Sequence, residues 1–287
     1  MLRVPSSINT KEFESLKIQD MTFVAYRNNI YPPRNEIFFE EHAIIYELEG
    51  EKRFVSPTQD VYVKKGQILF FQRGCYSMNE SIDTNYRSLV FFFPEKLLKE
   101  FVAQNLTLFE DYTQSSFEQI LSLESNGNFD LFVDSLIPFF SARTNLLNQF
   151  LKLKFDELML HLLDLDRSNQ FRITLFNIYQ GQKIDLSFFL ENYYLKPLSI
   201  NELARISGRS LSAFKRDFEL QFNTSPAVWI KNKRLEYAFF LLQNSQKNVS
   251  EISLEIGYES VSHFIKAFKE KYGFTPNKMN VVLDLKE

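Results

Sequence analysis

The stretch SINELARISGRSLSAFKRDFELQFNTSP at residues 199–226 has a second copy, NVSEISLEIGYESVSHFIKAFKEKYGFTP, at residues 248–276. When the copies are aligned on their final prolines, four pairs match at an offset of 50 positions: Ser210 with Ser260, Phe214 with Phe264, Phe218 with Phe268, and Pro226 with Pro276. Gly208 and Gly257 match at an offset of 49. The extra residue of the second copy therefore falls in a loop, where an insertion costs least. Two copies of one small structural unit indicate that the chain carries the same function twice.

Each copy is predicted to form a helix, a tight turn and a second helix. Ser199 followed by Glu202 is a capping box, in which each side chain accepts a hydrogen bond from the backbone N–H of the other residue. Asn248 with Glu251 offers a similar start. The glycine after each short helix suits a left-handed turn, and the serine two or three residues later suits the N-cap of the second helix.

The second helix of each copy, predicted at residues 210–221 and 260–271, has an apolar side and an outward side. A spacing of four residues places the phenylalanines on the side that packs inward. Such a unit is a helix-turn-helix, whose second helix fits the major groove of DNA. The alternative is an ordinary helical domain with a solvated basic face, and the duplication favours DNA.

The outward side chains are assigned to the DNA groups that their chemistry suits. Guanine or phosphate suits the basic residues Lys215, Arg216, Lys266 and Lys269. Short polar contacts to base edges suit Ser212 and Ser262, and a thymine methyl group suits Ile265. Arg209, at the start of the first of these helices, suits the DNA backbone.

A longer helix is predicted between the copies. Ser225 serves as its N-cap, Pro226 occupies its first turn, and it runs to about Asn244. Its roughly 18 residues span about 27 Å, which is close to the 34 Å between successive major-groove faces on one side of a duplex. One chain is therefore expected to contact two groove segments.

Residues 185 to about 280 resemble the DNA-binding domain of the AraC/XylS family of bacterial transcription regulators. The resemblance lies in the LA at 203–204, FKRDF at 214–218, RLEYAFFLL at 234–242, IGYES at 256–260 and HFIKAFKEKYGFTP at 263–276. It implies two helix-turn-helix units joined by a linker helix, binding to double-stranded promoter DNA, and the outcome usual in the family, activation through contact with RNA polymerase. It also implies an N-terminal domain that senses an effector or a partner, or dimerises. The residues themselves leave activation and repression open.

Residues 20 to 95 consist of short runs rich in β-branched and aromatic residues, broken by turn signals, which predicts an antiparallel barrel or sandwich. This part resembles the cupin-like barrel that precedes the DNA-binding domain in many members of the family. The expected fold class is α+β: a β-barrel with a helical subdomain at 1–166, a linker at 167–184, and an all-α double helix-turn-helix domain at 185–287.

Four helices are predicted between the barrel and the linker, at residues 93–105, 117–124, 130–143 and 145–166, from apolar residues at spacings of three and four. In the last of them, Leu146, Phe150, Leu153, Leu160 and Leu163 form a seam. Such helices resemble the dimerisation element of the family. A homodimer through helices within 130–166 and packing within the chain remain equal alternatives at this point.

Charge and cysteine content restrict the setting in which the chain works. The net charge is −3, but residues 185–280 carry 13 Lys and Arg against 10 Asp and Glu, so the charge is segregated in the direction that DNA binding requires. The one cysteine, Cys75, has no partner for an internal disulfide. Neither a signal peptide nor a membrane span is visible, and a cytoplasmic location is expected.

An enzymatic or metabolite-binding barrel is the competing class of function. A metal-dependent barrel enzyme needs clustered ligands, but the three histidines, His42, His161 and His263, lie in different predicted elements. No catalytic residues, metal or cofactor are therefore expected. The effector is left open: a polar cavity of ligand size would favour a metabolite, and a barrel filled by apolar side chains would favour a protein partner.

Overall fold

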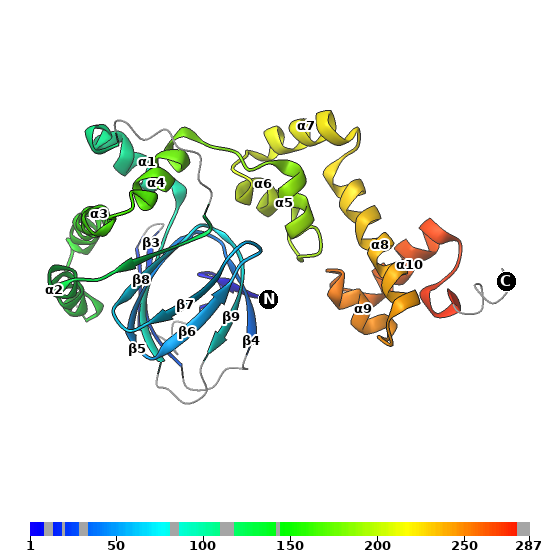
Figure 1. The fold of residues 1–287 in the computed structure, drawn as a ribbon, viewed down its shortest axis with the longest axis horizontal. Helices are drawn as coiled ribbons and strands as arrows, with labels where there is room; N and C mark the ends of the chain where they lie inside the picture. Colours follow the sequence, from blue (N-terminus) through cyan, green and yellow to red (C-terminus); the bar gives the residue numbers. More distant parts are fainter. Residues whose placement is uncertain are drawn as a thin grey trace. The chain divides into compact units, whose positions relative to one another are not determined.

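The computed structural model describes residues 1–8, 14–18, 21–28, 34–80, 86–109, 118–141 and 144–279. The chain folds as two compact units, residues 1–182 and residues 183–287 (Figure 1). The first unit contains every strand of the described residues, and the second contains helices only. The fold is therefore mixed α+β, with the β-rich part at the N-terminus.

The first unit contains two open β-sheets. A five-stranded sheet has the order β1-β4-β9-β6-β7, and a six-stranded sheet has the order β11-β8-β5-β10-β3-β2. The strands are β1 (Leu2–Val4), β2 (Glu14–Ile18), β3 (Met21–Asn28), β4 (Arg34–Phe39), β5 (His42–Glu49), β6 (Glu51–Val55), β7 (Asp60–Lys64), β8 (Gln67–Phe71), β9 (Gly74–Glu80), β10 (Tyr86–Phe93) and β11 (Ile120–Glu124).

This arrangement differs from the closed, fully antiparallel barrel that the sequence predicts. Within the described residues no ladder joins an edge of one sheet to an edge of the other, so both sheets stay open. In addition, β1 pairs with β4 in the parallel direction, with Leu2 opposite Ile37. Sheet closure depends on pairing between edges far apart in the sequence, and the alternation of apolar residues does not encode it.

The central strands β5, β8 and β10 of the six-stranded sheet are buried on both faces, which explains their unbroken apolar runs. In β8, Leu69 and Phe71 pack into the core between the two sheets, while Ile68 and Phe70 point to the opposite face. There they join a second core with the helices of the unit. Figure 1 shows these helices on one side of the β-rich part. The helical elements are α1 (Glu95–Gln104), η1 (Leu106–Leu108), α2 (Gly127–Leu136), η2 (Ile137–Phe140), α3 (Leu147–Leu165) and α4 (Gln170–Gln180).

Two predictions fail in this unit. The helix expected at 117–124 is strand β11, which pairs with β8 from Ile120 opposite Phe71 to Glu124 opposite Gln67; residue 117 lies outside the described residues. The stretch 167–184, expected to be a linker, contains helix α4, whose Phe171 and Leu175 are buried in the core of the first unit. Short apolar runs fit a strand or a helix equally well, and here tertiary pairing decides.

The second unit contains the repeated motif in the form that the sequence predicts. Its helices are α5 (Leu186–Tyr193), α6 (Ile200–Ile206), α7 (Leu211–Phe222), α8 (Pro226–Asn244), α9 (Val249–Glu255), α10 (Val261–Tyr272) and η3 (Pro276–Lys278). Both predicted capping boxes are present, at the starts of α6 and α9. Serine side chains cap α7, α8 and α10, and α8 ends at Asn244 as predicted.

Candidate nucleic-acid interface

Helix α7 buries one side and exposes the other, as its spacing predicts. Phe214 and Phe218 are fully buried, whereas Ser212, Lys215 and Arg216 are exposed. The side chain of Ser210 accepts a hydrogen bond from the backbone N–H of Ala213, which fixes the start of the helix. The exposed side of α7 is therefore a rigid surface of short polar and basic groups.

Helix α10 repeats this arrangement with one difference. Ser262, Lys266 and Lys269 are exposed, and Phe264 and Phe268 are buried against α8 and α9. Ile265 is half-buried and packs against the same core. Its side chain thus serves packing as well as the surface, which limits the apolar area that it offers to a thymine methyl group. His263, which the predicted set omits, is exposed beside Ser262.

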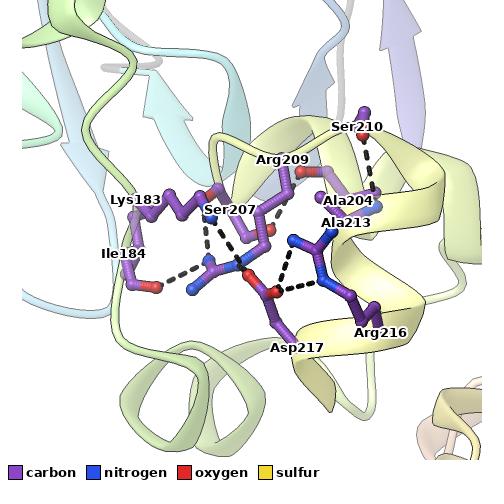
Figure 2. Close-up of polar contacts among 9 residues, drawn as sticks. All are labelled: Lys183, Ile184, Ala204, Ser207, Arg209, Ser210, Ala213, Arg216 and Asp217. Carbon is purple, nitrogen blue, oxygen red and sulfur yellow. Dashed lines mark hydrogen bonds and ion pairs between the residues drawn. The ribbon is translucent and has the colours of Figure 1, made fainter. Parts of the chain in front are cut away.

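Arg209 lies in a different environment from the other predicted contact residues. Its side chain is only 8% exposed, and its Nε donates to Asp217 Oδ2 at 3.2 Å. Its Nη1 donates to the carbonyl oxygens of Ile184 at 2.8 Å and Ser207 at 3.0 Å (Figure 2). The guanidinium thus ties the entry of the second unit to the turn before α7 through hydrogen bonds within the protein.

Asp217 is the centre of this cluster, and sequence reasoning missed it. Its carboxylate contacts Lys183 Nζ at 3.1 Å, Arg209, and both Nε and Nη2 of Arg216 (Figure 2). The hydrogen bond from Lys183, followed by those from Arg216 and Arg209, lowers the pKa of Asp217 to about 2. The carboxylate therefore remains ionised throughout the pH range of DNA binding.

Arg234 of α8 connects the segment between α5 and α6 to the second helix-turn-helix. Its Nε donates to the carbonyl oxygen of Tyr194 at 2.6 Å and its Nη2 to that of Lys196 at 2.6 Å, both in the segment before α6. Its Nη1 donates to the carbonyl oxygen of Gly257 at 2.9 Å, in the turn between α9 and α10. Burial lowers the pKa of Arg234 below its usual value. One side chain of the linker helix thus bonds to the second repeat and to the segment that leads into the first.

Gly257 lies where no other residue fits. Its φ is +80°, and a Cβ built on it would lie 2.3 Å from the backbone oxygen of Leu195. The glycine permits the left-handed turn. It also permits the turn between α9 and α10 to approach the segment before α6 closely. Gly257 and Arg234 meet at this point, which we call the Arg234 junction: Arg234, Gly257 and the backbone of residues 194–196.

Other chemistry-bearing groups lie apart from one another. Within the described residues, no group of three or more His, Cys, Asp and Glu side chains is placed to hold a metal ion. His42 is buried in β5 and stacks on Phe70, His161 of α3 contacts Phe129, and Cys75 is buried in β9. Over the same residues, every helix falls short of the length and apolarity of a bilayer span.

Known proteins resemble the chain over most of its length. Two family models match it, one for the ExsA N-terminal regulatory domain at residues 42–173 and one for a helix-turn-helix domain at residues 203–280. The virulence regulon transcriptional activator VirF of Yersinia enterocolitica is 24% identical over 233 residues, which cover 80% of this chain and 86% of VirF. The HTH-type transcriptional regulator ExsA of Pseudomonas aeruginosa is 33% identical over 93 residues, which cover 32% of this chain and 34% of ExsA.

Among solved structures, an apo ToxT variant of Vibrio cholerae aligns over 91% of this chain and 97% of its own, with a TM-score of 0.44 and 14% identity. The two family models cover the regulatory part and the repeated motif in the same order along the chain. The chain belongs to the AraC family: it is a DNA-binding transcription regulator, not an enzyme, with an ExsA-like regulatory domain before its helix-turn-helix domain.

Proposed function

We propose that α7 and α10 enter two adjacent major-groove segments of promoter DNA. The observation that carries this proposal is that both helices belong to one compact unit, start at equivalent serine caps and expose equivalent polar and basic sides. Helix α8 between them has 19 residues and thus spans about 28 Å. That length suits two groove segments one helical turn apart on the same side of the duplex.

The proposed contacts follow from exposure. Arg216 and Lys215 of α7, and Lys266 and Lys269 of α10, are exposed cations for guanine or phosphate, and Ser212 and Ser262 are exposed donors for base edges. The half-buried Ile265 retains the thymine methyl as its proposed partner. For Arg209 we propose a positioning role in place of a DNA contact, because its guanidinium already bonds Asp217, Ile184 and Ser207.

Replacing Arg216 by alanine is expected to weaken binding to the cognate site by about 1–3 kcal/mol and to relax base preference at one position. The reason is that a bidentate arginine distinguishes guanine from other bases, whereas a phosphate contact does not. The measurement is a binding titration of the full chain against the cognate site and its single-base variants. Lys233→Ala, which removes an exposed cation of α8, is the control. Equal losses on every sequence would contradict a base contact by Arg216.

The regulatory domain is proposed to respond to a protein partner. The cavity between the two sheets holds only about 110 Å³ and has mainly apolar walls, among them Phe39, Phe54 and Phe92. Pockets for small-molecule ligands are usually several hundred Å³ with convergent polar groups. The size and lining thus favour a protein over a metabolite as the effector. Activation is proposed to proceed through contact with RNA polymerase, in the cytoplasm where promoter DNA is found.

A second copy of the chain is the proposed occupant of the outer face of α3. Leu146, Phe150, Leu153 and Leu160 are exposed there, although the sequence seam that included them also contained the buried Leu163. Their spacings of four, three and seven residues match the contact positions of paired helices, so the same stripe on two protomers is self-complementary about a two-fold axis. Exposed apolar patches of this kind mark association surfaces.

Replacing Leu153 and Leu160 together by glutamate is expected to convert dimers to monomers, because two charges on each protomer would then face their own copies. Sedimentation velocity over a range of protein concentrations measures the change. Lys152→Glu, on an exposed position beside the stripe, is the control for added charge. A wild-type chain that stays monomeric at all concentrations, or a double variant with unchanged mass, would contradict the proposed dimer face.

A further inference from the structure

We infer that Asp217 determines the base specificity of the first helix-turn-helix: it holds the Arg216 guanidinium by one edge and leaves the opposite edge for a base. The inference rests on the proposed entry of α7 into the major groove. It adds a residue that makes no DNA contact of its own and acts only through Arg216. Asp217 is therefore a positioning residue.

The geometry of the pair leaves one edge of the guanidinium available. Arg216 donates from Nε at 3.3 Å and from Nη2 at 3.1 Å to the same oxygen of Asp217, Oδ1. The opposite edge of the guanidinium is formed by Nη1 and Nη2. Within the described residues, Asp217 Oδ1 is the one protein acceptor of the Arg216 guanidinium, so this edge is left for another partner. That edge is the one that donates two parallel hydrogen bonds to O6 and N7 of guanine. The Arg216 side chain is 67% exposed, against 22% for Asp217, so the guanidinium lies farther out than the carboxylate that holds it.

A neighbour in sequence does not normally hold an arginine on a helix, because adjacent side chains point in different directions. Here the carboxylate is itself fixed from behind. Its second oxygen, Oδ2, accepts from Arg209 Nε at 3.2 Å and from Lys183 Nζ at 3.1 Å (Figure 2). Arg209 is in turn bonded to the backbone of Ile184 and Ser207. The orientation of Asp217 is thus set by three elements: the entry segment, the turn and α7.

A fixed carboxylate affects specific and non-specific binding in opposite ways. A guanidinium already held in one orientation loses less side-chain entropy when it bonds to a base. The adjacent negative charge also repels phosphates, which supply nearly all of the non-specific affinity. Without the carboxylate, Arg216 keeps its charge and gains freedom to bond any phosphate within reach. Asp217 is therefore expected to raise the ratio of cognate to random affinity rather than the affinity itself.

The test uses the full chain with Asp217→Asn, which removes the charge and preserves the shape of the side chain. Affinity is measured for the cognate duplex, for the variant at the base pair that Arg216 contacts, and for a random duplex, each at two salt concentrations. We expect the cognate-to-random ratio to fall about tenfold, within the range of one bidentate contact, with tighter random binding and a steeper salt dependence. Glu219→Gln removes an equal charge from an exposed position of the same helix and is the matched control.

The double variant Arg216→Ala with Asp217→Asn separates positioning from a general effect of charge. If Asp217 acts through Arg216, then in the Arg216→Ala background Asp217→Asn changes the cognate-to-random ratio no more than Glu219→Gln does. A drop that persists without Arg216, or equal effects of Asp217→Asn and Glu219→Gln, overturns the inference. If Arg216→Ala alone leaves base preference intact, the proposed function of α7 fails instead, so the two failures are distinguishable.

Folding of each variant is followed by the fluorescence of Trp229, the one tryptophan of the chain, which packs on Phe218 and Phe222 in the second unit. If Asp217→Asn abolishes the cooperative transition, Lys183→Gln replaces it in the assay. This variant removes one of the two cations on Oδ2 and leaves Arg209 and Arg216 in place. A smaller fall in the cognate-to-random ratio is then expected, and an unchanged ratio overturns the inference.

Discussion

Replacing Arg234 by alanine is expected to lower the free energy of unfolding of the second unit by about 3 kcal/mol, because three backbone carbonyls lose a charged donor at a half-buried position. Binding to a cognate site is expected to fall further than stability alone explains. The second helix-turn-helix and the segment that leads into α6 lose the side chain that bonds to both, so the spacing of α7 and α10 is expected to become less fixed. Arg234→Lys keeps the charge but lacks the fork of donors, and its effect is expected to lie close to that of alanine.

The measurement is denaturant unfolding of the full chain followed by Trp229 fluorescence, which isolates the second unit without cutting the chain. Lys231→Ala is the control: it removes another cation of α8, whose ion pair with Glu270 is half-exposed on both sides and thus contributes at most about 1 kcal/mol. If Arg234→Ala shifts the unfolding midpoint no more than Lys231→Ala does, the Arg234 junction does not hold the second repeat to the segment that precedes the first.

Replacing Gly257 by alanine is expected to cost about 2–5 kcal/mol, from two contributions that add. A Cβ in a left-handed conformation costs about 1–2 kcal/mol, and forcing apart a close-packed contact costs about 1–3 kcal/mol. The contact in question is with the backbone oxygen of Leu195, at 2.3 Å from the added Cβ, and backbone cannot move aside as a flexible side chain can. The turn between α9 and α10 then shifts away from the segment before α6.

Gly273→Ala provides a matched control for this substitution. Gly273 has a φ of +84°, nearly that of Gly257, but a Cβ there has no described atom within 4 Å. It is thus expected to cost only the conformational part, about 1–2 kcal/mol. Trp229 fluorescence measures both variants. Equal unfolding midpoints for the two alanine variants would contradict a steric role for Gly257, since only the clash distinguishes the two positions.

The second unit could be predicted closely because its signals are local. A serine or asparagine followed three residues later by glutamate defines a helix start within four residues, and both such pairs form capping boxes. Asn223, at the end of α7, adopts the left-handed conformation with φ of +52°, which asparagine tolerates better than most residues. The exposed sides of α7 and α10 followed from the period of 3.6 residues alone.

The first unit was harder to predict because its structure depends on pairing between distant segments. Residues 120–124 form a strand because β8, some fifty residues earlier, offers an edge with the matching register. Helix α4 lies in the stretch expected to be a linker, and its place is set by burial of Phe171 and Leu175 in the core of the first unit. Whether two sheets close into a barrel likewise depends on their edges, which no local pattern specifies.

The candidate site shows the same division between local and distant information. Exposure of Arg216 and Lys266 could be predicted from helical spacing, but the bonds of Arg209 and Asp217 could not, since they join residues 183, 209 and 217 from three segments. An arginine at a helix start is as compatible with phosphate as with an internal carboxylate. The one sequence signal for the pair is the adjacent Arg216 and Asp217, which is too common to be specific.

Hydroxyl-radical footprinting of the full chain on its promoter tests most directly whether α7 and α10 contact neighbouring groove segments. The expected result is two protected segments for each bound protomer, on one face of the duplex, with centres about 10 base pairs apart. Arg216→Ala is expected to weaken protection of one segment and Lys266→Ala that of the other. A single protected segment, or two on opposite faces of the duplex, would contradict the proposed binding by both helices.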